Sequence, residues 1–375
     1  MESTKNISDG IIDLQFVQKG KELFKNNGKH LICLQFPVIN RKEVLKMKEE
    51  SKKRCELLIQ NRDAFREAFK WEDGLTCLAG AGIFTMAGKM ADVAALKQCK
   101  KIIEKRVSAF SYFVGAVRVP IAAILTESGR EEQLMEQGLT VYKRLKKDFM
   151  SSSYLPMAAM MIAQMTEEKN YEELAVRTRT LYKRIKAEHP FLTSSEDSPL
   201  CALLALSKKS DDELILDMEK CYEVLKPQFM HANALQSLTH VLALFDEPAE
   251  LKCEKTMQLF HGLKEAGKKY GTNYELPALG ELAMTDMPVK EIIQEMIEID
   301  EWLSKQKGFG LWSNVTPKQR LMYAGMLAQN ENIRTDAVQA ASVGSLVATI
   351  LAQEMVIIIM FVCSITVAAS NSSST

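Results

Sequence analysis

The stretch Val141-Tyr-Lys-Arg-Leu-Lys146 recurs forty residues later as Leu181-Tyr-Lys-Arg-Ile-Lys186, and this recurrence decides the fold. Looser copies follow at 221–226 and 259–264. In every copy the apolar residues fall at i, i+4, i+7 and i+11, which is one face of a helix. We therefore predict one amphipathic helix, here termed the A helix, in each repeat. Its anchor position is occupied at steps of 40, 40, 38 and 40 residues by Leu145, Ile185, Leu225, Leu263 and Leu303.

A second helix, the B helix, is predicted after each A helix from segments rich in alanine and other small apolar residues. Two examples are Pro156-Met-Ala-Ala-Met-Met-Ile-Ala163 and Pro199-Leu-Cys-Ala-Leu-Leu-Ala-Leu206. These segments are apolar nearly all round, so they must be buried between neighbouring helices. Prolines near their starts cost little, because the first turn of a helix lacks N–H acceptors anyway.

The alternation of A and B helices predicts an all-α chain of six or seven stacked helical hairpins between about 55 and 335. One hairpin cannot bury its own apolar face, so stacking must supply the core. The period favours an open α-solenoid, a superhelix of the HEAT or tetratricopeptide kind, and a closed α/α toroid is the alternative. We expect a helical lead-in at 1–54, an apolar C-terminal helix at 336–369 and a disordered tail at 370–375.

Composition narrows the possible functions. The 48 Lys and Arg residues balance 48 Asp and Glu residues, which argues against a protein that coats nucleic acid. The eight cysteines form no C-x-x-C pair, so neither a zinc ribbon nor a redox motif is predicted. Unpaired thiols and an N-terminus without an apolar signal fit a cytoplasmic protein. We expect no metal and no cofactor, since the glycine-rich stretch at 82–90 has Met90 where a phosphate-binding loop needs Ser or Thr.

The segment 343–369 raises the alternative of membrane attachment. Glu354 is the one formal charge between 340 and 369, and a stretch of this length could span a bilayer. Gln353 and Glu354 interrupt it, however, and no Lys or Arg follows Arg334 to anchor its end. We therefore favour a buried terminal helix and keep a membrane-associated protein as the alternative.

The most distinctive polar stretch is His189-Pro-Phe-Leu-Thr-Ser-Ser-Glu-Asp197. In stacked hairpins the A-to-B loops line one edge, so polar side chains from three successive loops would meet there. Such groups at helix N-termini could bind an anion or position a carboxylate for acid–base chemistry. The competing interpretation is helix capping, with Thr193 and Glu196 as a capping box and His189 at the end of the preceding helix. The candidate ligand-binding residues are His189, Ser194, Glu196, Asp197, His231, Asn233, Gln236, Ser152 and Tyr154.

Tyrosine recurs once per repeat at Tyr142, Tyr182 and Tyr222. A stripe of this kind favours packing between repeats. The alternative is an aromatic-lined groove that binds a peptide.

The 189–197 stretch and the Leu203-Leu-Ala-Leu206 segment that follows it also resemble the pattern of a known protein family. A His-x-Phe-Leu-Thr-x-x-Asp-Asp pattern ahead of a Leu-Leu-Ala helix is similar to an uncharacterised family of Bacillus-like Firmicutes, known only as a domain of unknown function. Glu196 replaces the first aspartate of that pattern. The resemblance covers roughly 10–365, implies an all-helical bacterial cytosolic protein, and transfers no catalytic residue.

From these observations we expect a helical-repeat scaffold that binds a protein or peptide in its concave groove, with no nucleic-acid partner. The sequence contains neither G-x-S-x-G nor H-E-x-x-H, so an enzyme is not favoured. The alternatives are an α/α-toroid enzyme or small-ligand-binding protein with its site at the A-to-B loops, or a membrane-attached helical protein.

Overall fold

The computed structural model describes residues 47–115, 117–310 and 313–329 of the chain. These residues are all-α, as predicted, and contain no strand. Two short 3-10 helices, η1 (Glu168–Asn170) and η2 (Ser195–Asp197), precede α8 and α9. The α-helices are α2 (Glu49–Ala68), α3 (Gly74–Met86), α4 (Val93–Arg106), α5 (Arg118–Ser128), α6 (Glu131–Leu145), α7 (Leu155–Met165), α8 (Tyr171–Glu188), α9 (Ser198–Leu206), α10 (Asp211–Leu225), α11 (Ala232–Leu242), α12 (Ala249–Glu265), α13 (Leu276–Ala283), α14 (Val289–Ser304) and α15 (Pro317–Ala328).

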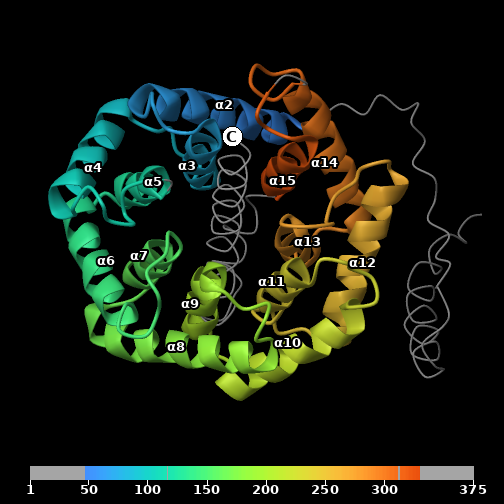
Figure 1. The fold of residues 1–375 in the computed structure, drawn as a ribbon. Coiled ribbons are helices and arrows are strands. Elements are labelled where there is room, and N and C mark those ends of the chain that lie inside the picture. The colour runs from blue at the N-terminus through green and yellow to red at the C-terminus, as the bar shows by residue number, and fades with distance from the viewer. Residues whose placement is uncertain (1–46, 116, 311–312, 330–375) are drawn as a thin grey trace, which may run out of the picture. The chain divides into compact units, whose positions relative to one another are not determined.

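These helices pair into seven hairpins arranged in two layers (Figure 1). The even-numbered helices, which correspond to the predicted A helices, form the outer layer. The odd-numbered helices from α3 to α15, the predicted B helices, form the inner layer. Burial follows the sequence pattern: α7 is buried continuously from Leu155 to Ala163, whereas α6 buries one stripe. The anchor positions of the repeat are all buried: Leu145, Ile185, Leu225, Leu263 and Leu303.

Small residues set how closely neighbouring helices approach, both between the two layers and within the inner layer. Gly138 of α6 faces Met160 of α7, and a Cβ atom at this glycine would overlap the Met160 sulfur. Gly280 of α13 likewise lies against Leu238 of α11. The close approach of neighbouring helices therefore depends on glycine at these positions.

The first and last hairpins contact each other, so the described helices close into a ring. Helix α2 packs against both α14 and α15. Lys48 Nζ lies 2.9 Å from Glu295 Oε2. The Arg62 guanidinium lies over the Phe309 ring, 5.6 Å from its centroid, and donates a hydrogen bond to the Lys307 carbonyl. The open superhelix favoured by the sequence is therefore wrong for these residues, and the closed α/α toroid is correct. The rotation from one hairpin to the next brings the seventh back to the first.

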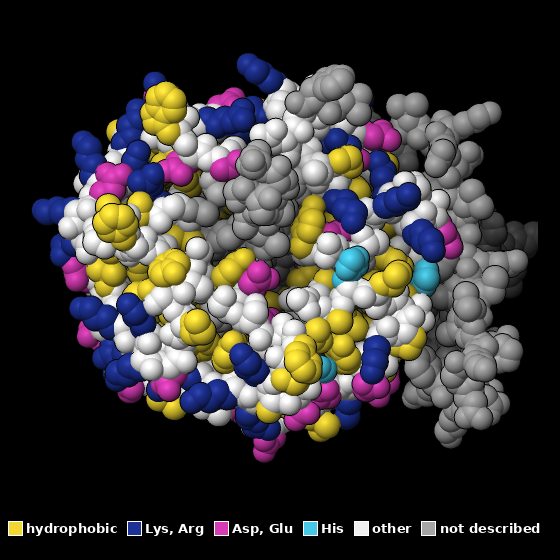
Figure 2. Space-filling model, in the orientation of Figure 1, with side chains coloured by type: hydrophobic (Ala, Val, Ile, Leu, Met, Phe, Trp, Pro, Cys, Tyr) yellow, Lys and Arg dark blue, Asp and Glu magenta, His cyan; other side chains and the backbone are white. Residues whose placement is uncertain are grey.

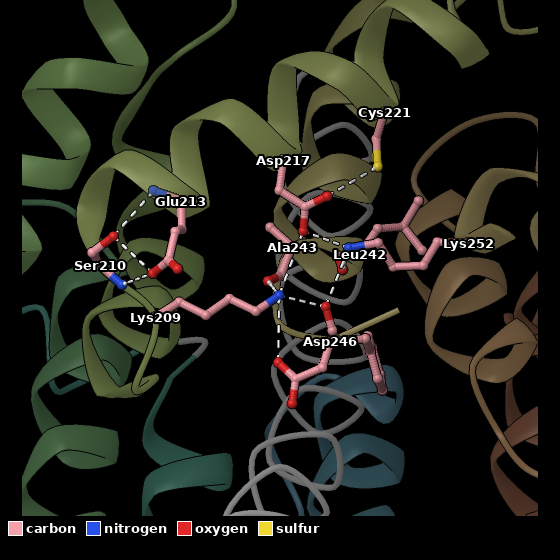
Figure 3. Close-up of polar contacts among 10 residues, drawn as sticks. Lys209, Ser210, Glu213, Asp217, Cys221, Leu242, Ala243, Asp246 and Lys252 are labelled. Carbon is pink, nitrogen blue, oxygen red and sulfur yellow. Dashed lines mark hydrogen bonds and ion pairs between the residues drawn. The ribbon is translucent and has the colours of Figure 1, made fainter. Parts of the chain in front are cut away.

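Cations hold the C-terminal ends of two inner helices, α9 and α11. At the end of α11, the fully buried Lys252 donates to the Leu242 carbonyl at 2.8 Å and to Asp217 Oδ2 at 2.5 Å (Figure 3). Lys209 donates to the Ala243 carbonyl at 2.9 Å. Arg177 does the same after α9, where it bonds the carbonyls of Ala205 and Ser207. These contacts satisfy carbonyl groups that a helix end leaves without partners.

Several expectations fall outside the described residues. These are most of the lead-in at 1–54, the apolar helix at 336–369 with its proposed membrane segment 343–369, and the tail 370–375. Within the described ranges the first helix starts at Glu49, before the expected boundary at 55. No helix within those ranges is both long and apolar enough to cross a bilayer.

Candidate functional site: the loop face

Successive outer-to-inner loops lie next to one another around the ring. Phe113 of the α4–α5 loop contacts Tyr142 near the end of α6, and Glu72 of the α2–α3 loop pairs with Arg118 at the start of α5. We call this band of loops the loop face. It is formed by the loops α2–α3, α4–α5, α6–α7, α8–α9, α10–α11, α12–α13 and α14–α15.

Edge-to-face and tilted aromatic contacts fix each of four successive loops to the next outer helix. In each case an aromatic side chain in the loop of one repeat contacts an aromatic side chain on the outer helix of the following repeat. The centroids of the two side-chain rings lie 4.5–5.1 Å apart. The predicted tyrosine ladder is confirmed as packing between repeats, so it does not line an open groove. The pairs are Phe113 with Tyr142, Phe149 with Tyr182, His189 with Tyr222, and Phe229 with Phe260.

Five successive loops also expose one large apolar side chain each to solvent. The five follow one another at steps of 39, 40, 41 and 39 residues, and each is between 86 and 99% exposed. A single exposed apolar side chain is ordinary on a protein surface, but the recurrence of one per loop sets this group apart as a candidate contact surface. Sequence reasoning missed them, although the repeat itself carried the signal. They are Trp71, Phe110, Met150, Phe191 and Met230, here termed the rim residues.

On the loop face most carboxylates form ion pairs within the protein, whereas several lysines do not. Five loop lysines are exposed and form no ion pair with another described residue: Lys70, Lys146, Lys269, Lys305 and Lys307. The loop carboxylates are mostly held within the protein. Glu72 pairs with Arg118, Asp148 with Arg179 at 2.7 Å, and Glu275 with Lys318 at 3.1 Å. Figure 2 shows apolar side chains set among both basic and acidic side chains on the face that it presents.

A buried polar cluster lies beneath the α8–α9 and α10–α11 loops. Gln236 Nε2 donates to Thr193 Oγ1 at 2.7 Å, and Thr193 Oγ1 donates to the His189 carbonyl at 3.1 Å. His240 Nδ1 lies 3.8 Å from Asp197 Oδ1, and both side chains are buried. Gln236 Oε1 and both His240 ring nitrogens are buried without a hydrogen-bond partner among the described residues. Neighbouring loops therefore meet here, as the repeat predicts.

Burial governs protonation in this cluster. It raises the pKa of Asp197 to about 7, with a smaller contribution from the nearby Glu196 carboxylate. Burial, together with the nearby His189, lowers the pKa of His240 to about 3. His240 is therefore neutral at physiological pH, and its contact with Asp197 is not an ion pair.

The predicted candidate residues have different roles in the structure. His189 occupies the ladder position held by phenylalanine in both neighbouring repeats, and its Nε2 lies 2.9 Å from Glu219 Oε1. The predicted capping box of Thr193 and Glu196 is wrong. Ser194 and Asp197, one residue later, form the box, because Asp197 rather than Glu196 accepts the Ser194 N–H at 2.8 Å.

The side chains of Glu196, His231, Asn233 and Ser152 form no hydrogen bond with the polar cluster within the described part of the chain. Glu196, His231 and Asn233 are exposed, and His231 starts α11 without a side-chain cap bond. Ser152 Oγ is buried and has no described hydrogen-bond partner, and Tyr154 is buried at the start of α7.

A basic pocket of about 480 Å³ opens between the α12–α13 loop and the start of α15. Four cations line it, namely Lys268, Lys269, Lys318 and Arg320, together with Asp300. Lys268 and Arg320 share Asp300 at 2.7 and 2.6 Å, which leaves the pocket with a positive surplus. No group of three His, Cys, Asp or Glu side chains in the described ranges is arranged to hold a metal ion.

The closed ring of hairpins with a loop face can be compared with known proteins. Over residues 61–361 the chain matches the family described as "Protein of unknown function (DUF4003)", and it belongs to that family. A similar protein is the uncharacterized protein YeaA of Bacillus subtilis (strain 168), which is 26% identical over 216 residues. That match covers 55% of this chain and 63% of YeaA, less than two thirds of the relative. No solved structure matches the chain significantly. The predicted resemblance to an uncharacterised Firmicutes-type family is confirmed.

Proposed function

We propose that the chain is a binding protein that docks on a partner surface through its loop face. One observation carries the proposal: the five rim residues are nearly fully exposed, one on each of five successive loops. Leaving such side chains in water forgoes the free energy of burying them, roughly 1.5–3 kcal/mol each. A partner that covers the loop face would recover it.

This proposal keeps the binding role expected from the sequence and moves the contact from the concave groove to the loops. Asp197 and His240, whose pKa values are among the most displaced, are buried side chains. They give less support to an enzyme than the rim residues give to a docking surface.

Site-specific photocrosslinking in cells tests the proposal. A benzophenone amino acid at Phe110 or Phe191 inserts into any C–H bond nearby, whether the partner is protein or lipid. The matched control places it at Leu216, which is exposed on the outer helix α10. We expect adducts at the two rim positions and few at Leu216. Equal yields at all three positions, or none at the rim, would refute the proposal.

The polar cluster supports a second candidate function, the binding of a small polar ligand. The observation in its favour is that Gln236 Oε1 and both His240 ring nitrogens are buried without described partners, and buried polar atoms normally have one. Native mass spectrometry of the purified chain tests it. We expect a bound small molecule on the natural protein that is lost in His240→Phe, and identical masses without an adduct would exclude it.

A further inference from the structure

We infer that the surface on which the loop face docks is an anionic phospholipid bilayer. This inference rests on the proposed function and names the partner. In this arrangement the rim residues insert among the lipids, and the loop lysines lie against the headgroups.

The chemistry and distribution of the rim residues favour lipid over protein. Trp and Phe with Met on exposed loops suit the boundary between headgroups and acyl chains, where aromatic rings are enriched. Protein interfaces concentrate their energy in a central cluster of buried anchors. The rim residues instead stand singly, one per loop, around a face. A flat, deformable partner accommodates five separate insertions more readily than a second folded surface does.

Charge complementarity supplies the second argument. Lysines close to an anionic bilayer are attracted to it, whereas carboxylates are repelled. The five unpaired loop lysines are free for such contacts, and Glu72, Asp148 and Glu275 are engaged by cations of the protein itself. Glu196 is the one exposed loop carboxylate in the described ranges without a side-chain partner or a capping role.

The basic pocket gives a lipid phosphate a place to bind. Lys268, Lys269, Lys318 and Arg320 surround it, and it opens beside the α12–α13 loop on the loop face. A headgroup phosphate there would meet more cationic than anionic groups. A free phosphate compound has the same chemistry, so the experiment separates the two.

Co-sedimentation of the full chain with vesicles tests the inference. Vesicles of equal parts phosphatidylglycerol and phosphatidylcholine are compared with pure phosphatidylcholine vesicles. Insertion of roughly half of each side chain contributes about four- to twelvefold to binding, so a variant that lacks three of these side chains should bind at least about fiftyfold more weakly. This rim variant keeps 343–369 intact, so that segment's contribution stays constant. The rim variant is Trp71→Ser, Phe110→Ser, Phe191→Ser, and the wall control is Val176→Ser, Leu216→Ser, Leu251→Ser, whose side chains are 40–57% exposed.

The charge contribution has its own variant. Lys146→Glu with Lys269→Glu should weaken binding to the anionic vesicles at least about tenfold, because each lysine near the surface contributes about fivefold. Pure phosphatidylcholine vesicles should bind the natural chain weakly. Millimolar glycerol phosphate should not release the bound chain, and complete release would show that a free phosphate compound, not a bilayer, is the ligand.

The outcomes separate this inference from the proposed function. Equal binding by the rim variant and the wall control, or no binding to anionic vesicles, overturns the bilayer. If Phe110 then crosslinks to a protein, docking through the loop face stands and the lipid partner fails. If the rim positions also yield no adduct, both proposals fail.

Discussion

Replacing Lys252 with methionine tests how the ring holds its inner helices. Lys252 is fully buried, and its ammonium group bonds Asp217 and the carbonyls of Leu242 and Phe245. Methionine keeps much of the volume but removes the charge and all three donors. Asp217 then loses its closest cation, and carbonyl groups at the end of α11 lose a donor (Figure 3).

The expected cost follows from the burial of the pair. Removing one partner of a buried ion pair costs about 3–5 kcal/mol. The Asp217 side chain is 17% exposed and keeps Lys209 at 3.5 Å, so the lower value applies. We expect Lys252→Met to reduce the free energy of unfolding by about 3 kcal/mol. At roughly 2 °C per kcal/mol, as befits a domain of this size, Tm falls by about 6 °C.

Thermal unfolding followed by circular dichroism measures this effect, with Lys255→Met as the matched control. Lys255 lies on the same helix and pairs with Glu247 at 3.4 Å, but its side chain is 33% exposed. An exposed pair contributes at most about 1 kcal/mol. Replacing Asp217 with leucine as well should recover part of the loss, because the uncompensated charge is gone. Equal Tm shifts for Lys252→Met and Lys255→Met would refute the reasoning.

Three further predictions concern pH, packing and the aromatic ladder. Burial raises the pKa of Glu281 to about 8, so the folded ring binds an extra proton between about pH 4.5 and 8 and loses stability as pH rises through that range. Glu281→Gln should flatten this decline in Tm between pH 5 and 9, and an unchanged slope would contradict it. Gly138→Ala should cost about 1–3 kcal/mol in urea unfolding because its Cβ overlaps Met160, and Met160→Ala should reduce that cost. His189→Phe should change stability by less than about 1 kcal/mol, since phenylalanine fills this position in both neighbouring repeats and only the pair with Glu219 is lost. A loss above about 3 kcal/mol would contradict the role of His189 as a ladder residue.

The helices could be predicted from the sequence because their signals are local. The anchor step from Leu145 to Leu303 and the small-residue segments between the anchors identified the outer and inner helices. Ring closure could not be predicted in the same way. It depends on the rotation at each hairpin interface, summed over seven hairpins, and on contacts such as Lys48 with Glu295 that join the two ends of the repeat.

At the candidate site, the contact between neighbouring loops could be predicted from the sequence, but several of its side chains could not. The repeat placed the loops of Thr193 and Gln236 side by side, and a hydrogen bond joins them. His240 was missed because it lies near the end of an apolar helix, where nothing in the spacing distinguishes it from a core residue. The rim residues were missed because an apolar side chain in a loop is usually read as a packing residue. Its exposure is settled by the neighbouring aromatic residue, such as Phe149 beside Met150, that takes the buried position instead.

The most direct test of docking on a bilayer is the environment of Trp71. Trp302→Phe with Trp312→Phe leaves Trp71 as the single tryptophan of the chain. Its emission is measured with phosphatidylglycerol-containing vesicles that carry brominated lipids, which quench a tryptophan inserted among them. We predict a shift to shorter wavelength and strong quenching, because this almost fully exposed side chain leaves water when the loop face docks. Vesicle-bound protein whose Trp71 emission stays that of a tryptophan in water would contradict the account.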